Sequence, residues 1–300
     1  MGCTQCPRYC NVDRSQGELG FCRRGMLPEV AMADLHFWEE PCISGSNGSG
    51  AVFFSGCNLS CAFCQNYQIS QSGRVGREYS VEALASIFLM LEGRGAHNIN
   101  LVSPTHFSEK VAEAIRQARN MGLKIPFIYN SNGYESLETL EIMDGLIDVY
   151  LPDLKYFSDE IARKYSSAPS YFEHASKAIL EMSRQVGIPQ FDEQGVIQRG
   201  LIVRHLVLPG QIEDSKKVLR WIKEELPEGT YVSLMAQYCP VHRAKQYPEI
   251  NRTLTWREYD EIVKELYDLE LEDGYIQELA SANTEFIPDF GVEAHEPNVM

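Results

Sequence analysis

Short apolar runs alternate with amphipathic stretches along most of this chain. Runs rich in β-branched and aromatic residues predict six strands, at 51–56, 98–103, 127–130, 147–151, 200–208 and 231–238. Continuous apolar runs of this length are typical of strands that are buried on both faces of a parallel sheet.

Amphipathic patterns between these runs predict the helices. Apolar residues recur at helical spacing over 81–93, 108–122, 136–143, 159–186, 215–226 and 255–269. Ser80 and Thr255 are suitable N-caps, and Pro169 is expected to interrupt the long fourth helix. Six strand–helix units in succession predict a barrel or a doubly wound sheet.

We therefore expect an α/β protein with a partial (β/α)6 TIM-like barrel over residues 50–270. Residues 1–49 do not follow the alternation and are rich in Cys and Gly, so they are expected to form an irregular, metal-stabilised extension. Within it, 44–50 is predicted to be a loop. Residues 271–300 are expected to be a tail that packs on the barrel.

Composition narrows the possible partners and location. The 300 residues are 44% hydrophobic, and 27 Lys and Arg against 42 Asp and Glu give a net charge of −15. Such an acidic chain is not expected to bind nucleic acid or an anionic membrane. No apolar run approaches the roughly 18 residues of a membrane span, and no secretion signal is recognisable. A cytoplasmic location is expected.

The nine cysteines are placed unevenly. Eight lie within the first 64 residues, and only Cys239 lies beyond them. A disulfide scaffold is not expected in a chain of this length without a secretion signal. Clustered thiols in such a chain indicate metal ligands.

Three cysteines form a compact motif directly after the first predicted strand. Cys57, Cys61 and Cys64 are separated by three and two residues. Three thiolates hold three irons of a 4Fe–4S cluster and leave the fourth iron open to a substrate. The carboxyl end of a barrel strand is where active sites of such barrels lie. Three cysteines also fall short of a four-ligand structural zinc site.

This motif, with Phe63 before its last cysteine, resembles the signature of the radical S-adenosylmethionine (radical SAM) superfamily. The resemblance implies a 4Fe–4S cluster, SAM, and a donor of one electron such as a flavodoxin or ferredoxin. It also implies reductive cleavage of SAM to methionine and a 5′-deoxyadenosyl radical, which removes hydrogen from a substrate.

Further segments resemble the activating enzymes of pyruvate formate-lyase and other glycyl-radical enzymes. Arg204, ahead of Leu-Pro-Gly at 208–210, takes the place of a contact to the SAM carboxylate. Asn130, Ser131 and Asp153 take the places of residues that help to bind the ribose and a monovalent cation. Asn130 replaces an Asp there, which removes one negative charge from the cation site. A strand-end Arg204 and a helix-capping Asp153 are the structural alternatives.

One segment departs from the family pattern. Val-Ser-Pro-Thr-His at 102–106 replaces the usual Gly-Gly-Glu-Pro, which grips the SAM amino group. Ser103 and Thr105 are the candidate neutral acceptors in its place. His106 is a candidate proton donor or ligand, or else a polar residue that lines the pocket.

Four further cysteines precede the barrel, namely Cys3, Cys6, Cys10 and Cys22, and we refer to them as the N-terminal quartet. Four thiolates suffice for zinc or for a closed 4Fe–4S cluster. Free thiols on a disordered arm are the alternative. Several single residues are weaker candidates: a spare ligand or buried residue (Cys42), a hydrogen donor or buried thiol (Cys239), and pocket-lining groups (His36, Tyr129, His205).

Three functions fit these patterns. The first is an activase that acts on a glycine of a protein partner. The second is a radical SAM enzyme that modifies a small molecule or another polypeptide residue. The third is a non-catalytic iron–sulfur or zinc protein, which the open-coordination motif and the SAM-like segments disfavour.

Overall fold

A curved, mostly parallel sheet forms the centre of the molecule. The computed structural model describes residues 2–71, 75–282 and 290. Six parallel strands follow one another in chain order across the sheet. They are β2 (Ser49–Phe54), β4 (Ile99–Val102), β5 (Phe127–Ser131), β6 (Val149–Pro152), β8 (Ile197–Leu206) and β9 (Tyr231–Met235). The expected partial (β/α)6 fold and its six strands are confirmed.

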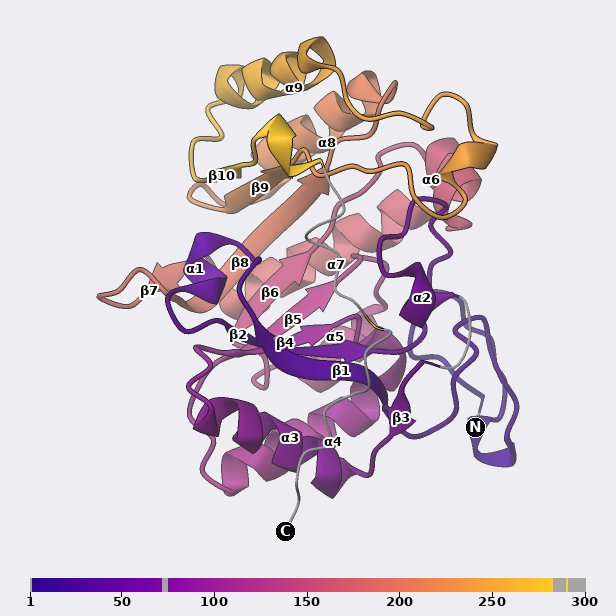
Figure 1. Cartoon of the computed structure of the whole chain (residues 1–300), viewed down its shortest axis with the longest axis vertical. Coiled ribbons are helices and arrows are strands. Elements are labelled where there is room, and N and C mark those ends of the chain that lie inside the picture. The colour runs from indigo at the N-terminus through magenta and orange to yellow at the C-terminus, as the bar shows by residue number, and fades with distance from the viewer. Residues whose placement is uncertain (1, 72–74, 283–289, 291–300) are drawn as a thin grey trace.

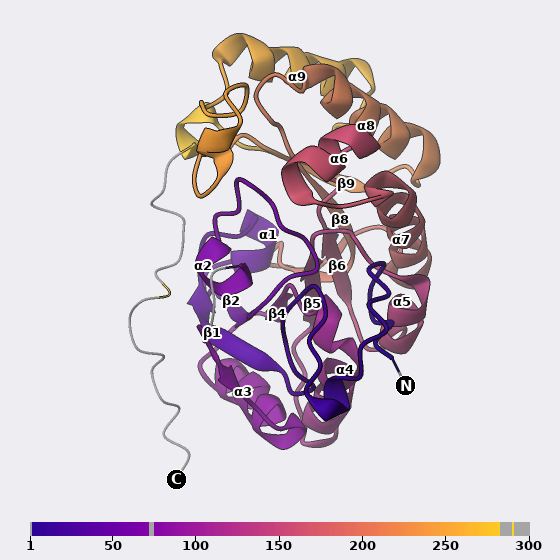
Figure 2. The ribbon, with the colours of Figure 1, turned by 90° about the vertical axis from the view of Figure 1, so that its right-hand side faces the viewer.

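The helices form an arc around the outside of this sheet (Figures 1 and 2). They are α3 (Val81–Gly93), α4 (Ser108–Asn120), α5 (Leu137–Met143), α6 (Asp159–Ser166), α7 (Tyr171–Val186), α8 (Ile212–Glu225) and α9 (Trp256–Asp268). None of the helices in the described part of the chain has the length and apolar character needed to cross a bilayer.

Local sequence explains where several helices begin and end. The Ser80 hydroxyl accepts a hydrogen bond from the Ala83 N–H at the start of α3, and Thr255 forms a capping box with Glu258 at the start of α9. The predicted break at Pro169 separates α6 from α7. Helix α8 begins earlier than expected, at Ile212, so that its first turn includes two acidic residues, which favour a helix N-terminus.

Alternation along the strands divides the core between two faces of the sheet. Phe127 and Tyr129 of β5 pack in the large cluster beneath the outer helices. Ile128, between them, faces the concave side, where it packs against Cys42 and Ile43. These two residues belong to α1 (Pro41–Ser44), which therefore fills part of the concave face.

The N-terminal region is less irregular than expected. Residues Glu29–His36 form β1, which pairs antiparallel with β2 and places His36 opposite Ser49. Two short strands, β3 (Arg77–Glu78) and β7 (Gln190–Phe191), add to β1 and β8. Without β1, one edge of β2 would expose unpaired backbone groups, and an added strand satisfies them. The irregular part is thus confined to the residues before β1.

Part of the expected tail also joins the sheet. Strand β10 (Gly274–Ile276) pairs parallel with β9 and extends the barrel edge. Gly274 is required there, because a Cβ at this position would lie 2.0 Å from the Val232 carbonyl oxygen. The expectation that 271–300 packs on the barrel falls in part on residues 283–289 and 291–300, which lie outside the described residues.

Candidate functional site

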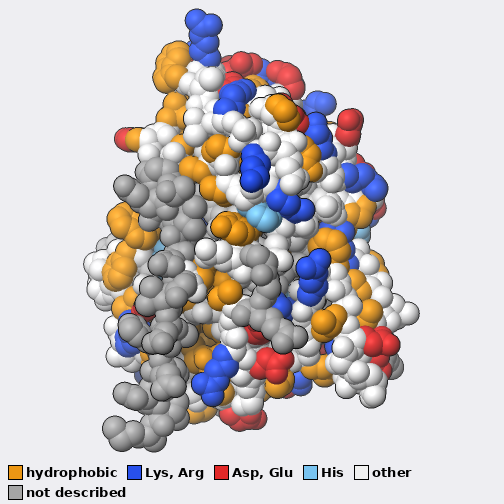
Figure 3. Space-filling view, turned by 45° about the vertical axis from the view of Figure 1, so that its right-hand side comes forward, with side chains coloured by type: hydrophobic (Ala, Val, Ile, Leu, Met, Phe, Trp, Pro, Cys, Tyr) orange, Lys and Arg blue, Asp and Glu red, His pale blue; other side chains and the backbone are white. Residues whose placement is uncertain are grey.

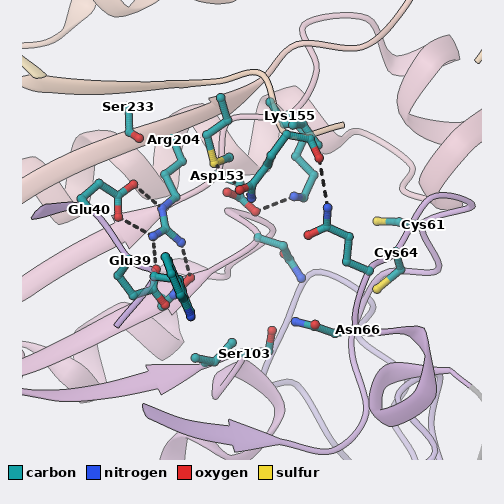
Figure 4. A pocket seen from close by; sticks show the side chains of 18 of the residues that line it. Glu39, Glu40, Cys61, Cys64, Asn66, Ser103, Asp153, Lys155, Arg204 and Ser233 are labelled. Carbon is teal, nitrogen blue, oxygen red and sulfur yellow. Dashed lines mark hydrogen bonds and ion pairs between the residues drawn. The ribbon is translucent and has the colours of Figure 1, made fainter. Parts of the chain in front are cut away.

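A cavity of about 340 Å³ lies at the carboxyl ends of the parallel strands. Each of the six parallel strands contributes a residue at or just beyond its end, and His36 with residues 38–41 forms another part of the wall. The side chains point inward from these separate elements (Figure 4). This is the position at which barrels of this type assemble their active sites.

The three cysteines of the loop at 57–64, here called the cysteine loop, line this cavity. Neighbouring groups are aimed at their sulfurs. Leu59 N–H donates to Cys57 Sγ at 3.3 Å, Ser166 Oγ–H donates to Cys61 Sγ at 2.9 Å, and Ser70 Oγ lies 3.3 Å from Cys64 Sγ. Donors of this kind stabilise thiolates, which are the form that binds metal.

The thiols of the loop are neutral until a metal is bound. Burial raises the pKa of Cys57 to about 12 and that of Cys61 to about 11. Metal coordination therefore releases protons from these thiols. Three sulfurs on one wall, with donors already in place, fit three corners of a 4Fe–4S cluster.

Most residues expected to contact SAM also line the cavity. Phe63, Ser103, Asn130, Asp153 and Arg204 all do so. Ser103 adopts a left-handed backbone, with φ of 59°, which is uncommon for a residue other than glycine. Its N–H donates to the Asn130 carbonyl at 2.8 Å, so this bond holds the unusual conformation.

Two of the residues expected to contact SAM, Thr105 and Ser131, do not line the cavity. Thr105 Oγ1 donates to Glu135 Oε1 at 2.6 Å in a buried cluster. Ser131 follows the inward-facing Asn130, so strand alternation turns its side chain away, and its Oγ accepts from the Gly133 N–H at 3.2 Å.

His106 lines a different, smaller cavity. Its Nε2 pairs with the Ser55 carbonyl at 2.7 Å, and it faces the N-terminal quartet instead of the large cavity. Burial lowers its pKa to about 3, which leaves the ring neutral. His36 does line the cavity, whereas Tyr129, His205 and Cys239 do not.

Arg204 is engaged by two carboxylates that the sequence analysis missed. Its guanidinium bonds Glu40 through Nε at 2.8 Å, and its Nη2 forms ion pairs with Glu39 and Glu40 (Figure 4). Burial would raise the pKa of Glu40, but the charge and hydrogen bonds of Arg204 outweigh it and lower that pKa. Only Nη1, 3.5 Å from Asn130 Oδ1, is outside the ion pairs, so a SAM carboxylate would compete for the rest.

One feature of the sequence indicates that Arg204 needs acidic partners such as Glu39 and Glu40. Arg204 lies within the apolar run at 201–208, and an arginine in a buried strand requires a counter-charge. Glu39 and Glu40 precede a proline in a region that the strand pattern does not cover, so nothing local links them to Arg204 across more than 160 positions.

A second ion pair joins Lys155 Nζ and Asp153 Oδ2 at 2.5 Å in the cavity wall. Burial would lower the pKa of Lys155, but the neighbouring carboxylate of Asp153 raises it, so the side chain is charged. The wall therefore carries three carboxylates, of Glu39, Glu40 and Asp153, against the two cations of Lys155 and Arg204. This excess favours a ligand with positive charge, such as a sulfonium.

Comparisons with known proteins agree with this arrangement. Residues 51–222 match the family model described as the radical SAM superfamily. The uncharacterized protein MJ0674 of Methanocaldococcus jannaschii is 30% identical over 282 residues, which cover 90% of this chain and 76% of that protein.

Solved structures resemble the fold. Streptococcus suis SuiB bound to the precursor peptide SuiA matches with a TM-score of 0.51 and 13% identity over 76% of this chain and 48% of SuiB, so this chain spans about half of that protein. A domain of a pyruvate-formate lyase-activating enzyme from Bacteroides vulgatus matches with a TM-score of 0.41 and 14% identity, over 57% of this chain and 91% of the domain. Because the family model covers more than half of its length, this chain belongs to the radical SAM superfamily.

Proposed function

We propose that this chain cleaves SAM reductively at a 4Fe–4S cluster held by Cys57, Cys61 and Cys64, and that its substrate is a polypeptide, most like the target of a glycyl-radical activase. The observation that carries the proposal is that the three thiols line the same cavity as five of the residues that are expected to contact SAM. Three protein ligands leave one iron of the cluster open.

Different residues of the chain are assigned to SAM binding and to the exclusion of water. When bound, the cluster and SAM supply one electron and a 5′-deoxyadenosyl radical. Ser103, Asn130 and Asp153 line the cavity at three strand ends, and we assign to them the orientation of SAM. The ion pairs of Arg204 with Glu39 and Glu40 close one buried part of the cavity wall. This closure keeps water away from the carbon that carries the radical. A flavodoxin or ferredoxin is the proposed electron donor.

The small size of the cavity favours a polypeptide substrate, of which only one segment enters the cavity. A volume of about 340 Å³ is at the lower end of the range for ligand pockets, roughly 300–1,000 Å³, so SAM would take most of it. A substrate then presents one backbone segment or side chain at the open end. SuiB, which has the same fold, is known bound to a precursor peptide. The resemblance of the segments around Asp153 and Arg204 to those of activases favours a glycine of a protein partner as the target.

The SAM reaction is tested by anaerobic reconstitution with iron and sulfide, followed by dithionite and SAM. The expected product is 5′-deoxyadenosine. Cys57→Ala should abolish it, and Cys239→Ala, which removes a buried thiol outside the cavity, should not. A chain with its cluster intact that forms no 5′-deoxyadenosine would contradict the proposal.

The substrate class is tested separately. Candidate glycyl-radical enzymes are added to the reduced protein with SAM, and an electron paramagnetic resonance signal of a glycyl radical is sought. With glycine-deuterated partner, deuterium should appear in 5′-deoxyadenosine. Transfer from a deuterated small molecule, with no glycyl radical on any partner, would favour the alternative that this enzyme modifies a small molecule.

A further inference from the structure

The N-terminal quartet lines a second, smaller cavity, next to the barrel residue His106. Each thiol of the quartet lies within electrostatic range of at least one other: Cys6 of Cys10 and Cys22, and Cys22 of Cys3 and Cys10. All four are free thiols. The chain therefore brings the sulfur of Cys22 together with those of Cys3, Cys6 and Cys10.

Tight turns bring these sulfurs together. The Tyr9 N–H donates to the Cys6 carbonyl at 3.0 Å, and the Arg23 N–H donates to the Gly20 carbonyl at 3.0 Å. Gly20 also permits a close approach, because a Cβ there would lie 3.0 Å from Cys10 Sγ. The two turns thus present their cysteines to the same cavity.

Backbone N–H groups point at the sulfurs. Phe21 N–H donates to Cys10 Sγ at 3.3 Å. The backbone N–H groups of Arg8 and Arg24 act in the same direction on Cys6 and Cys22, because each lowers the pKa of its thiol against the larger effect of burial. Such donors stabilise the thiolate, as they do at the cysteine loop, although burial still raises the pKa of both thiols.

The segment that carries the quartet lacks a core of its own. Its regular structure before β1 is a single turn at Arg14–Gln16, and hydrophobic side chains are exposed, among them Leu19 and Phe21. Hydrophobic side chains are open to solvent on this side of the molecule (Figure 3). Three residues other than glycine have left-handed backbones, namely Tyr9, Asn11 and Arg23. Segments this short usually need a covalent or metal cross-link to hold such conformations.

The segment lies against the cysteine loop. Figure 1 places it at the end of the sheet toward which the parallel strands point. Arg8 Nε donates to the carbonyl of Asn58, the residue after Cys57, at 2.8 Å, and Arg8 Nη2 donates to the Ser167 carbonyl at 2.6 Å. Arg14 Nη1 donates to the His106 carbonyl at 2.6 Å. Order in this segment therefore supports one side of the radical SAM site.

We propose that Cys3, Cys6, Cys10 and Cys22 bind a second metal centre through four thiolates. Zinc and a closed 4Fe–4S cluster share this ligand chemistry. Among the described residues, no group of three or more His, Cys, Asp or Glu side chains has the geometry to hold a single metal ion. The same is true of the cysteine loop. Ligation at the quartet therefore includes an inward movement of the thiols.

The test is a metal count on the full chain, purified anaerobically. In the triple variant Cys57→Ala, Cys61→Ala, Cys64→Ala, the quartet is expected to retain either about four irons with sulfide, or about one zinc, per chain. An absorption spectrum separates the two arms, because zinc thiolates lack the visible bands of a cluster. Adding Cys6→Ser and Cys22→Ser to the triple variant should remove that metal. Adding Cys42→Ala and Cys239→Ala instead should leave it.

A second measurement uses the unmodified chain. Native alkylation followed by peptide mass spectrometry should show the quartet protected until a chelator is added. Absence of both metals from the triple variant, together with alkylation of the quartet in the unmodified chain, would overturn the proposal. So would disulfides among the four cysteines, or metal that survives Cys6→Ser with Cys22→Ser. None of these results depends on SAM cleavage, so the two proposals fail separately.

Discussion

Replacing Arg204 with methionine should destabilise the protein strongly, because it leaves two buried carboxylates without a counter-charge. The side chains of Arg204, Glu39 and Glu40 are only 12%, 10% and 6% exposed. Removing one partner of a buried pair costs about 3–5 kcal/mol. For a chain of this size, that cost lowers the melting temperature by on the order of 10 °C.

The loss should depend on pH in a defined direction. In the native protein Arg204 holds the pKa of Glu40 below its ordinary value, so this contribution is present above the unfolded pKa and is lost as pH falls through the native pKa. In Arg204→Met, burial acts without the opposing charge of Arg204 and should raise the pKa of Glu40 from its value in the native protein. The variant must then ionise a buried acid as pH rises, so its deficit should be larger at pH 8 than at pH 5.

The assay is anaerobic calorimetry at the two pH values, with a matched control. Arg184→Met removes an arginine that is 61% exposed and pairs with Glu181 and Asp144, which should cost no more than about 1 kcal/mol. Adding Glu39→Gln and Glu40→Gln to Arg204→Met should recover much of the loss. Equal effects of the two arginine variants at pH 8, or a deficit that does not grow with pH, would refute the reasoning.

Three smaller perturbations test other parts of the structure. Ser166→Ala removes the hydrogen bond to Cys61 Sγ, which stabilises the reduced cluster more than the oxidised cluster. Losing about 1 kcal/mol of this difference should lower the reduction potential of the cluster by roughly 40 mV in a redox titration. An unchanged potential would contradict that contact. Burial raises the pKa of Glu135 to about 7, so its contribution to stability, present below about pH 4.5, is lost as pH rises toward 7. Glu135→Gln should flatten this part of the pH–stability curve, measured by urea unfolding, and an unaltered curve would count against the buried acid. Thr255→Ala should cost about 1 kcal/mol by loss of the capping box with Glu258, seen as a lower melting temperature, and no change would show that this cap is not needed.

The sequence was most informative where structure depends on neighbours along the chain. The caps at Ser80 and Thr255, the break at Pro169 and the six apolar runs are local features, and the structure has each of them. The cysteine spacing at 57–64 is likewise local, because one short loop must hold three corners of one cluster. A family signature of this kind needs no tertiary information.

The sequence failed where the outcome depended on which side of an element faces the cavity. Ser131 has the right chemistry on the right strand, yet a step of one residue along a strand reverses the side-chain direction. Thr105 lies beyond its strand, in the short 3-10 turn Thr105–Phe107, where its hydroxyl donates to Glu135. Strand β1 was missed because its contribution is to cover the edge of β2, which is a tertiary requirement.

By itself, the sequence determined the order of strands and helices, the cysteine loop and the family to which the chain belongs. Only the tertiary structure decided that Glu39 and Glu40 neutralise Arg204, and that the four N-terminal thiols share one cavity. The physical reason is the range of the interactions. Backbone propensity and capping act within a few residues, whereas burial of a charge selects whichever partner the fold brings within reach.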